Sequence, residues 1–508
     1  MPSSAELVGK DSSWRQRSEL QAMADMSPEL EKEMERLDQA FWVSGEKLKE
    51  IVQRFREELD EGLQENGKNI PMNVTWVPSL PTGDEKGTFL TLDLGGTNLR
   101  VCKVVLHGNE ANPATPEKKS SLDQEQYKLP DELKTGTAEE LWTYIAEKLL
   151  DFLKDRGLDK QYTKEKPMPL GFTFSYPATQ DRIDHAVLQT WTKGFDIKGV
   201  EGQDVAAQLR EKVESSDLPL ELVCVVNDTV GAMVASAYND PDTIIGAIFG
   251  TGCNAAYMSS LSSIKKLNLQ TSKPQKRTVD GESKDHEASA KENQEEKMAI
   301  NCEYGAFDNA LRVLPRTKYD EEVDRESPRP GEQAFEKLSA GLYLGEIFRL
   351  VLTDLADRGL VFNNQDTSQL RTPYTIDTGF LSQIEDDESP AFTSTRELFH
   401  NTLNLDVSDQ EIELSRRLAE LIAVRGARLC ACGIAAICGK EGIDRGHVAA
   451  DGSVANKHPK FKKRWAKALG EVLGWREGEE GRIVITSAED GSGIGWCMDL
   501  GKRREMFK

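Results

Sequence analysis

The spacing of apolar residues changes along the chain, and these changes predict its elements. From Ser27 the segment SPELEKEMERLDQAF has apolar residues at helical spacing, with Ser27 suited to cap the helix and Pro28 suited to its first position. The helical pattern returns between Leu48 and Leu63. We therefore expect a helical N-terminal segment, preceded by a loose, disordered tail over residues 1–26.

From Gly87 onward the pattern changes to short strand-like runs that end in glycine or polar residues. The runs are GTFLTLDLGGTNLRVCKVVLHG, PLGFTFSYP, ELVCVVNDT, TIIGAIFGTGCNAAYM, GHVAADGSV and GRIVITSAEDGSGIG. Helical segments lie between them, among them residues 332–355 and 408–438. The mixture predicts an α/β protein, and 508 residues are enough for two domains or two large lobes.

One segment, from Thr271 to Lys297, has almost no apolar residues. Such a segment cannot bury enough surface to offset the entropy lost on ordering. We interpret it as a disordered surface insertion rather than as a linker between domains.

Composition argues against several classes of protein. The net charge of −22 disfavours nonspecific binding to nucleic acid, whose phosphates attract basic surfaces. No apolar run approaches the roughly 20 residues of a spanning helix, and the N-terminal residues lack the apolar core of a signal peptide. The eight cysteines include no C-x-x-C pair, and no H-E-x-x-H occurs, so we expect buried, reduced thiols and no direct metal site.

Glycine turns follow four of the predicted strands. They are Gly95-Gly96-Thr97, Gly250-Thr251-Gly252, Asp451-Gly452-Ser453 and Gly491-Ser492-Gly493. Glycine lets backbone N–H groups approach a phosphate closely, and a hydroxyl adds a donor. One such turn is usually only structural, but four of them favour a phosphate site. The chain has neither a P-loop motif nor a G-x-G-x-x-G turn placed to open a Rossmann helix.

Two aspartates stand where strands end. Asp93, beside the first glycine turn, would repel a phosphate unless Mg²⁺ lay between them; alternatively, it stabilises the turn. Asp228, in VVNDTVGAM, leaves a strand and enters an apolar, helical run. That position suits a general base, and it equally suits a helix cap.

Seven stretches together resemble the hexokinase family. LDLGGTNLRV, LGFTFSYP, WTKGFDIKGVEG, VNDTVGA, IFGTGCNAAY, INCEYGAFDN and ADGSV occur in the family's order over nearly the whole chain. LPRTKYD and ESPRPGEQAFEKLSAGLYLGEIFRL look most like the fungal branch. The resemblance implies a two-lobed actin-like ATPase (ribonuclease H-like) fold closing around a hexose. Residues 28–238 would form mainly the small lobe, and residues 242–500 mainly the large lobe with the insertion.

The resemblance also implies roles for single residues. Asp228 would take the proton from the sugar 6-hydroxyl, with Lys193 as the second catalytic residue. The hexose-binding positions would be Ser175, Thr192, Lys193, Asn227, Asp228, Asn254, Glu303 and Glu336. The ATP-binding positions would be Asp93, Gly95, Gly96, Thr97, Asn98, Thr251 and Ser453, with Thr378, Ser382 and Ser492 as further matches. Mg²⁺ would arrive with ATP and lie near Asp93 without a direct protein ligand.

The implied activity is ATP-dependent phosphorylation of a hexose (glucose, fructose or mannose), the first step of glycolysis. A cytosolic monomer or homodimer is expected, with a mitochondrial or nuclear fraction as a further option. Gln126, Ala186, Ala310 and Trp496 depart from the family pattern. These departures keep open a sugar sensor or regulator with little catalysis. An actin-like or chaperone ATPase without a sugar substrate is disfavoured by the sugar-side residues.

Overall fold

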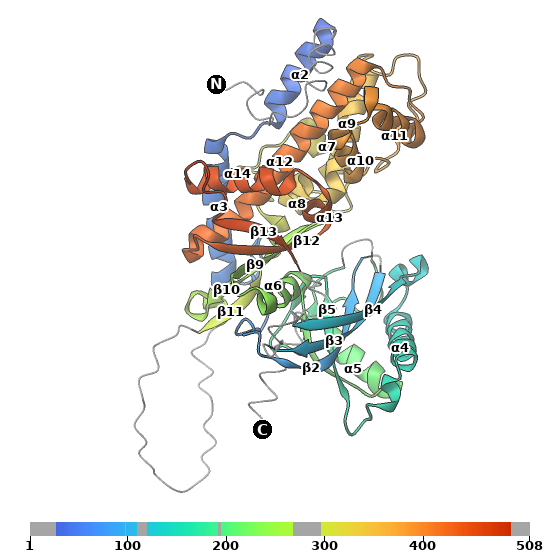
Figure 1. Ribbon diagram of the computed structural model, residues 1–508, viewed down its shortest axis with the longest axis vertical. Helices are drawn as coiled ribbons and strands as arrows, with labels where there is room; N and C mark the ends of the chain where they lie inside the picture. Colours follow the sequence, from blue (N-terminus) through green and yellow to red (C-terminus); the bar gives the residue numbers. More distant parts are fainter. Residues whose placement is uncertain (1–26, 97, 109–118, 192–194, 268–295, 489–508) are drawn as a thin grey trace, which may run out of the picture.

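The computed structural model describes residues 27–96, 98–108, 119–191, 195–267 and 296–488. These residues form two lobes, each built around one sheet (Figure 1). The predicted tail over residues 1–26 and most of the predicted insertion lie outside the described residues, as do Thr97, Thr192, Lys193, Ser492 and Trp496. The insertion boundary at Lys297 is wrong, because Lys297 opens a strand and pairs with Ser260. Strand pairing uses backbone groups, so a polar side chain does not prevent it.

The small lobe contains a five-stranded sheet with the order β4-β3-β2-β5-β8. Its strands are β2 (Lys86–Leu94), β3 (Asn98–His107), β4 (Ser120–Lys128), β5 (Met168–Phe174) and β8 (Leu220–Val226). Strands β2, β3 and β4 form an antiparallel meander, whereas β5 and β8 continue the sheet in parallel with β2. Helices α4 (Ala138–Asp155) and α5 (Val205–Ser215) share an apolar core with one face of this sheet. A short ribbon, β6 (Ala178–Thr179) and β7 (Val187–Leu188), lies beside it.

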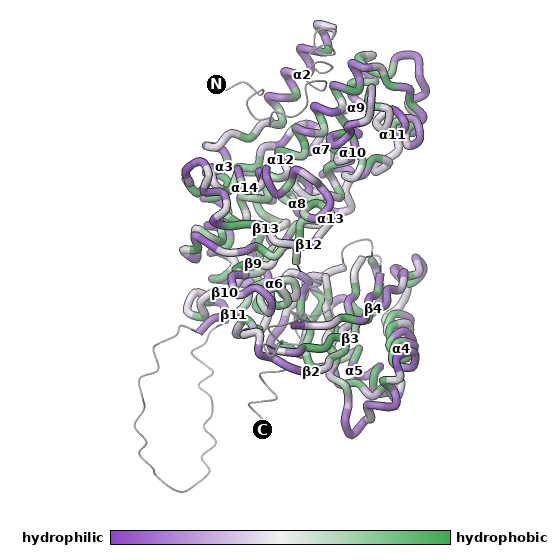
Figure 2. Tube along the Cα trace, viewed as in Figure 1, coloured by the Kyte–Doolittle hydropathy of each residue, from purple (hydrophilic) through white to green (hydrophobic). Residues whose placement is uncertain are grey.

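The large lobe contains a six-stranded sheet with the order β1-β11-β10-β9-β12-β13. Its strands are β1 (Asn73–Val74), β9 (Thr243–Phe249), β10 (Cys253–Ser260), β11 (Lys297–Asn301), β12 (Gly446–Asp451) and β13 (Ile483–Ser487). Its helices are α2 (Pro28–Phe41), α3 (Gly45–Gln64), α7 (Lys318–Glu326), α8 (Ala334–Ser339), α9 (Gly341–Asp357), α10 (Thr378–Asp386), α11 (Thr393–Leu403), α12 (Asp409–Glu441), α13 (Ser453–Lys457) and α14 (Phe461–Leu473). The apolar segments lie inside both lobes, along the strands of the sheets (Figure 2).

The two sheets repeat one topology. In both, a three-stranded antiparallel meander is followed by two strands parallel to its first strand: β2-β3-β4 with β5 and β8, and β9-β10-β11 with β12 and β13. The carboxyl ends of parallel strands meet at one edge of a sheet, where ligands bind in open α/β sheets. Helix α6 (Asp228–Asn239) lies between the lobes, in a core shared by strands of both (Figure 1).

The helix predicted over residues 408–438 is confirmed as α12, which Ser408 caps through a capping box with Glu411. By length and composition α12 could cross a membrane, contrary to our expectation, but 94% of its apolar window is buried inside the protein. It is therefore a core helix of the large lobe. Its three cysteines are among seven described cysteines, all free and buried as predicted.

Two further helix predictions have different outcomes. Ser27 caps α2 and Pro28 begins it, as predicted. The helix predicted over residues 332–355 is instead split into α8 and α9. Gln333 has a left-handed backbone (φ +55°) and Ala340 an extended one, so the helical hydrogen bonding starts late and breaks once.

Glu385, at the end of α10, is a buried carboxylate that joins α10 to the α13–α14 region. Its Oε2 lies 2.6 Å from Arg464 Nη2, and its Oε1 lies 3.4 Å from His458 Nε2. Burial alone would raise the pKa of Glu385, but the nearby His458 ring and the hydrogen-bonded, charged Arg464 outweigh it and lower the pKa from 4.5 to about 2. The charged form of Glu385 therefore stabilises the fold.

We expect acid to remove this contribution. Because the folded pKa lies below the unfolded pKa, the stabilisation is complete above pH 4.5 and is lost as the pH falls towards 2. The shift corresponds to about 3 kcal/mol in the free energy of unfolding. Urea unfolding of the parent protein and Glu385→Gln should show a stability difference that shrinks by about this amount between pH 6 and pH 2. A difference that stays constant with pH would contradict the assignment.

Candidate active site

The candidate residues gather at strand ends of both sheets. Ser175 follows β5, Asn227 follows β8, and Asp228 opens α6. Asn254 lies in β10, and Glu303 follows β11. Sequence positions far apart are thus brought to neighbouring strand ends, as expected for a site built on this kind of sheet.

Glu303 collects amide donors from three segments. Its Oε1 accepts hydrogen bonds from Asn301 Nδ2 at 2.8 Å, Asn254 Nδ2 at 3.2 Å and Asn227 Nδ2 at 3.5 Å. Its own backbone N–H donates to Asn254 Oδ1 at 2.9 Å. These contacts hold Glu303 at φ +56°, a left-handed conformation that costs a non-glycine residue about 1–3 kcal/mol. The hydrogen-bond network thus holds the Glu303 carboxylate in a position that the local backbone preference of a glutamate would not favour.

Asn227 connects this network to helix α6. It is the N-cap residue: its Oδ1 accepts from the Thr229 N–H at 2.9 Å and from Thr229 Oγ1 at 2.6 Å. The alternative of Asp228 as the cap is therefore wrong. Asp228 is the first residue of the helix and half-buried, and its Oδ1 also accepts from the Thr229 N–H at 2.9 Å. The N-terminal end of a helix favours a charged carboxylate.

Asn301 belongs to the network, and our sequence reasoning did not select it. The side chain is buried, and besides donating to Glu303 it accepts from Asn254 Nδ2 at 2.8 Å and from Thr229 Oγ1 at 3.2 Å. An asparagine ending the apolar run MAIN, two residues before Glu303, was the signal in the sequence. A buried amide there needs partners, and the neighbouring polar residues supply them.

Glu336, on α8, approaches the same edge from another direction. Its Oε2 accepts from the backbone N–H of Cys253 at 3.1 Å. A Cβ on Gly252 would lie 2.8 Å from Glu336 Oε2, and one on Gly305 would lie 3.2 Å from Glu336 Cβ. These two glycines let Glu336 lie close to the segments that carry Asn254 and Glu303.

Two of the glycine turns pack backbone against backbone. A Cβ on Gly452 would lie 2.5 Å from the carbonyl oxygen of Phe249, and Gly452 has φ +109°, which glycine adopts readily. A Cβ on Gly250 would lie 3.1 Å from Gly452 Cα. The Gly341 N–H donates to the Gly250 carbonyl at 2.7 Å. The turns that carry the candidates Thr251 and Ser453 are therefore neighbours.

Helix α10 joins this region through its first residue. Thr378 Oγ1 donates to the carbonyl oxygen of Gly341. Ser382 Oγ donates to the carbonyl oxygen of Thr378 at 3.3 Å, within the same helix. The hydroxyls of both candidates thus donate to backbone oxygens, while each hydroxyl oxygen can still accept a hydrogen bond.

The first glycine turn joins β2 to β3 and is closed by a hydrogen bond from the Gly95 N–H to the Asn98 carbonyl at 3.1 Å. Tyr176 Oη donates to the carbonyl oxygen of Gly95 at 3.1 Å. Burial, together with the negative charges of Asp93 and Asp228, raises the pKa of Tyr176 well above its usual value. Tyr176 therefore links the first glycine turn, through its hydrogen bond to Gly95, to a region that carries two negative charges.

Comparison with known proteins establishes the family. Two family models, both described as hexokinase, match residues 244–498 and 33–238. The chain belongs to the hexokinase family. It is 50% identical to the hexokinase of Emericella nidulans, covering 93% of this chain and 91% of that protein. Hexokinase-1 of Saccharomyces cerevisiae is 47% identical, with coverage of 93% and 92%.

A solved structure supports the same assignment. The hexokinase of Schistosoma mansoni, determined in complex with glucose, is 31% identical with a TM-score of 0.78, covering 93% of this chain and 99% of that one. The resemblance inferred from the sequence motifs and the two-lobed fold are both confirmed.

Three departures from the hexokinase pattern can be located. Ala186 is buried and lines a cavity together with Tyr176, Asn227 and Asn301. Gln126 is exposed on the edge strand β4, and Ala310 is exposed as well. Of these three, only Ala186 lies beside the amide network.

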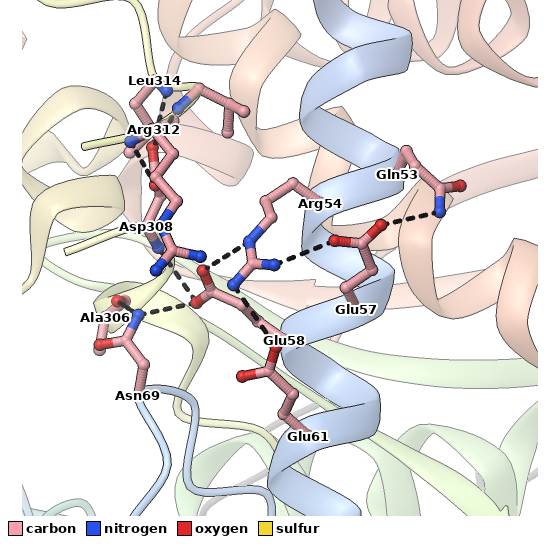
Figure 3. A network of polar contacts seen from close by, with 11 residues as sticks. Gln53, Arg54, Glu57, Glu58, Glu61, Asn69, Ala306, Asp308, Arg312 and Leu314 are labelled. Atoms are coloured by element: carbon pink, nitrogen blue, oxygen red, sulfur yellow. Dashed lines mark hydrogen bonds and ion pairs between the residues drawn. The ribbon is translucent and has the colours of Figure 1, made fainter. Parts of the chain in front are cut away.

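A second polar network supports the segment that follows Glu303 (Figure 3). Glu58, buried on α3, accepts from Asn69 Nδ2 at 2.7 Å, from the Asp308 N–H at 3.2 Å and from Arg54 Nε at 3.3 Å. The fully buried Asp308 carboxylate in turn accepts from the backbone N–H groups of Arg312, Val313 and Leu314. Helix α3 thus anchors the loop on which this hexokinase holds Glu303.

Glu58→Ala should therefore destabilise the protein more than removal of its neighbour. The change removes an acceptor shared by the half-buried Asn69 amide, the buried Asp308 N–H and Arg54, and of these the Asp308 N–H has no other acceptor among the described contacts. The free energy of unfolding should fall by about 2–4 kcal/mol. Glu57→Ala is the matched control, because the exposed Glu57 carboxylate bonds the side chains of Gln53 and Arg54 on its own helix. Its loss should cost about 0.5 kcal/mol or less. Equal effects in urea unfolding would contradict the anchoring role.

Proposed function

We propose that this hexokinase-family protein transfers the γ-phosphoryl group of ATP to the 6-hydroxyl of a hexose, with glucose as the first candidate and fructose and mannose as others. The amide and carboxylate network around Glu303, directly beside Asp228 at the start of α6, carries the proposal. The glucose complex of the Schistosoma mansoni relative supports it.

On the sugar side, the proposed contacts are Ser175, Asn227, Asn254, Glu303 and Glu336, together with Thr192 and Lys193. A hexose is a ring of hydroxyls, each of which both donates and accepts hydrogen bonds. Carboxylates suit the donors, and hydrogen bonds to charged groups contribute roughly 1.5–3 kcal/mol each. A site that hydrogen-bonds the substrate rejects analogues lacking those hydroxyls, because its own polar groups are then left unpaired.

Asp228 is the proposed general base. It is half-buried, and the positive end of α6 favours the charged carboxylate that can accept a proton. In the proposed reaction Asp228 accepts the proton of the 6-hydroxyl as that oxygen bonds to the γ-phosphorus of ATP. The bond between the γ-phosphorus and the β,γ-bridging oxygen breaks, and ADP leaves. Lys193 is proposed to offset the charge that develops during the transfer.

On the nucleotide side, Gly95, Gly96, Thr97 and Asn98 are the proposed phosphate contacts. Thr251, Thr378, Ser382, Ser453 and Ser492 complete the proposed ATP site. The half-buried carboxylate of Asp93, beside this turn, suits a hydrated Mg²⁺ bound with ATP. When bound, Mg²⁺ would neutralise charge on the phosphates. Closure of the lobes would keep water from competing as acceptor.

Location and assembly stay predictions from the sequence. They are a cytosolic monomer or homodimer and, as a further option, a mitochondrial or nuclear fraction. The described residues bear on none of these.

Asp228→Ala tests the catalytic assignment. Turnover in a coupled assay with ATP-Mg²⁺ and glucose should fall by about 10²–10⁴-fold, the usual contribution of a general base. Glucose binding, followed by tryptophan fluorescence, should stay measurable, which shows that the variant is folded. A loss of turnover below about tenfold would contradict the role of Asp228. A parent protein that binds glucose but does not turn it over would instead be the sugar sensor considered above.

Asn301→Ala tests the newly found member of the network. Without the Asn301 amide, Glu303 loses the nearest of the three side-chain amides that donate to its carboxylate and should be less well positioned for the sugar. We expect the KM for glucose to rise by about 10- to 100-fold, the worth of one hydrogen bond to a charged group. The KM for ATP serves as the internal control and should be unchanged. A parallel rise in both constants would indicate general loosening instead.

A further inference from the structure

Arg329 reaches from the large lobe to the small lobe. It lies in the segment between α7 and α8, and its side chain is 44% exposed. Its Nη2 donates to the carbonyl oxygen of Trp191 at 3.0 Å and to Thr190 Oγ1 at 2.5 Å. Trp191 belongs to the apolar core of the small lobe, so these hydrogen bonds run between the lobes.

On the large-lobe side, hydrogen bonds from Lys337 fix the backbone of Arg329. Lys337 is buried, and its Nζ donates to the carbonyl oxygen of Arg329 at 2.7 Å and to Asp324 Oδ1 at 2.7 Å. Asp324 also accepts from the Gly331 N–H at 3.0 Å, which fixes the intervening turn. Lys337 directly follows Glu336 on α8. One braced unit therefore carries both Arg329 and a proposed hexose-binding carboxylate.

The small-lobe end is also held. Trp191 is 4% exposed; its backbone N–H donates to Glu201 Oε2 at 3.2 Å, and its indole Nε1 donates to the carbonyl oxygen of Ile197 at 3.1 Å. Its ring lies against Tyr176, with ring centroids 4.8 Å apart, and Tyr176 in turn bonds Gly95. The carbonyl that Arg329 contacts is thus part of a rigid group that reaches the first glycine turn.

We propose that Arg329 is a positioning residue that clasps the two lobes in the arrangement that binds the hexose. It acts through Trp191 and Thr190 and does not itself touch substrate. A guanidinium suits this role, because it stays charged and donates to two acceptors in a fixed geometry. An interlobe bond stabilises only the arrangement in which it forms, so its loss lowers the affinity of a ligand that needs that arrangement. The inference rests on the proposed hexose phosphorylation.

Arg329→Ala, Arg329→Lys and the control Arg325→Ala form the test. Arg325 is an exposed arginine four residues away that pairs with Glu322 and Glu326 within its own helix. In Arg329→Ala we expect the KM for glucose to rise by about 5- to 30-fold, with kcat and the KM for ATP close to the parent values. Arg329→Lys should recover part of the loss, because an ammonium can still reach one acceptor. Arg325→Ala should match the parent.

Thr190→Val refines the test by removing one of the two acceptors. The KM for glucose should rise less in Thr190→Val than in Arg329→Ala. In the double variant the rise in the KM for glucose should be smaller than the product of the two single-variant rises, because both substitutions remove the same hydrogen bond. An unchanged glucose KM in Arg329→Ala, or an equal rise in Arg325→Ala, would overturn the clasp. The clasp would also be overturned if Arg329→Ala lowered only kcat. It would be overturned as well if Arg329→Ala lowered the thermal midpoint of unfolding and Arg329→Lys did not restore the KM for glucose.

Failure of the proposed function is a separate result. If the parent protein turns over no hexose, the glucose dissociation constant from calorimetry replaces KM. Arg329→Ala should still raise that constant by about 5- to 30-fold if the clasp holds, and an unchanged constant would overturn it.

Discussion

The position of the Glu303 carboxylate is the constraint on which the rest of the site depends. One oxygen accepts from three amides, and these come from β10, from β11 and from the junction of β8 and α6. The last of these belongs to the small-lobe sheet and the other two to the large-lobe sheet. A left-handed backbone at Glu303 is held in place by the same contacts. The left-handed backbone of Glu303 persists because the surrounding hydrogen bonds stabilise it more than its conformational strain costs.

The duplicated sheet topology explains why such contacts can form. Each sheet ends its first strand in a glycine turn, and its parallel strands end at the same edge. Helix α6, which begins with Asp228, packs against strands of both sheets. Close backbone packing at Gly250 and Gly452 then brings two turns together without side chains between them. The described residues of the proposed site thus gather where two similar edges meet.

Support for the site comes from buried polar residues that are not among the proposed contacts. Helix α3, near the start of the chain, anchors the loop after Glu303 through Glu58 and Asp308 (Figure 3). Lys337 braces the segment of Arg329 beside Glu336. These are buried polar groups with several partners each, and such groups restrict a backbone to one arrangement. The N-terminal helices therefore serve the site as well as the core, although they contribute none of the proposed contacts.

The sequence by itself determined the class of fold, most elements and the family. Apolar periodicity located α2, α3, α12 and the strand runs, and the ordered motifs identified the hexokinase family. Both signals depend on residues close together in the sequence, so they can be recognised without the structure. Tertiary structure alone decided the break between α8 and α9, the capping role of Asn227 and the membership of Asn301 in the Glu303 network. It also decided the contact of Arg329 with Trp191. Each of these depends on backbone geometry and hydrogen bonds that form only when the chain folds. The pattern of residue types along the sequence does not specify which distant group a buried amide or an arginine will bond.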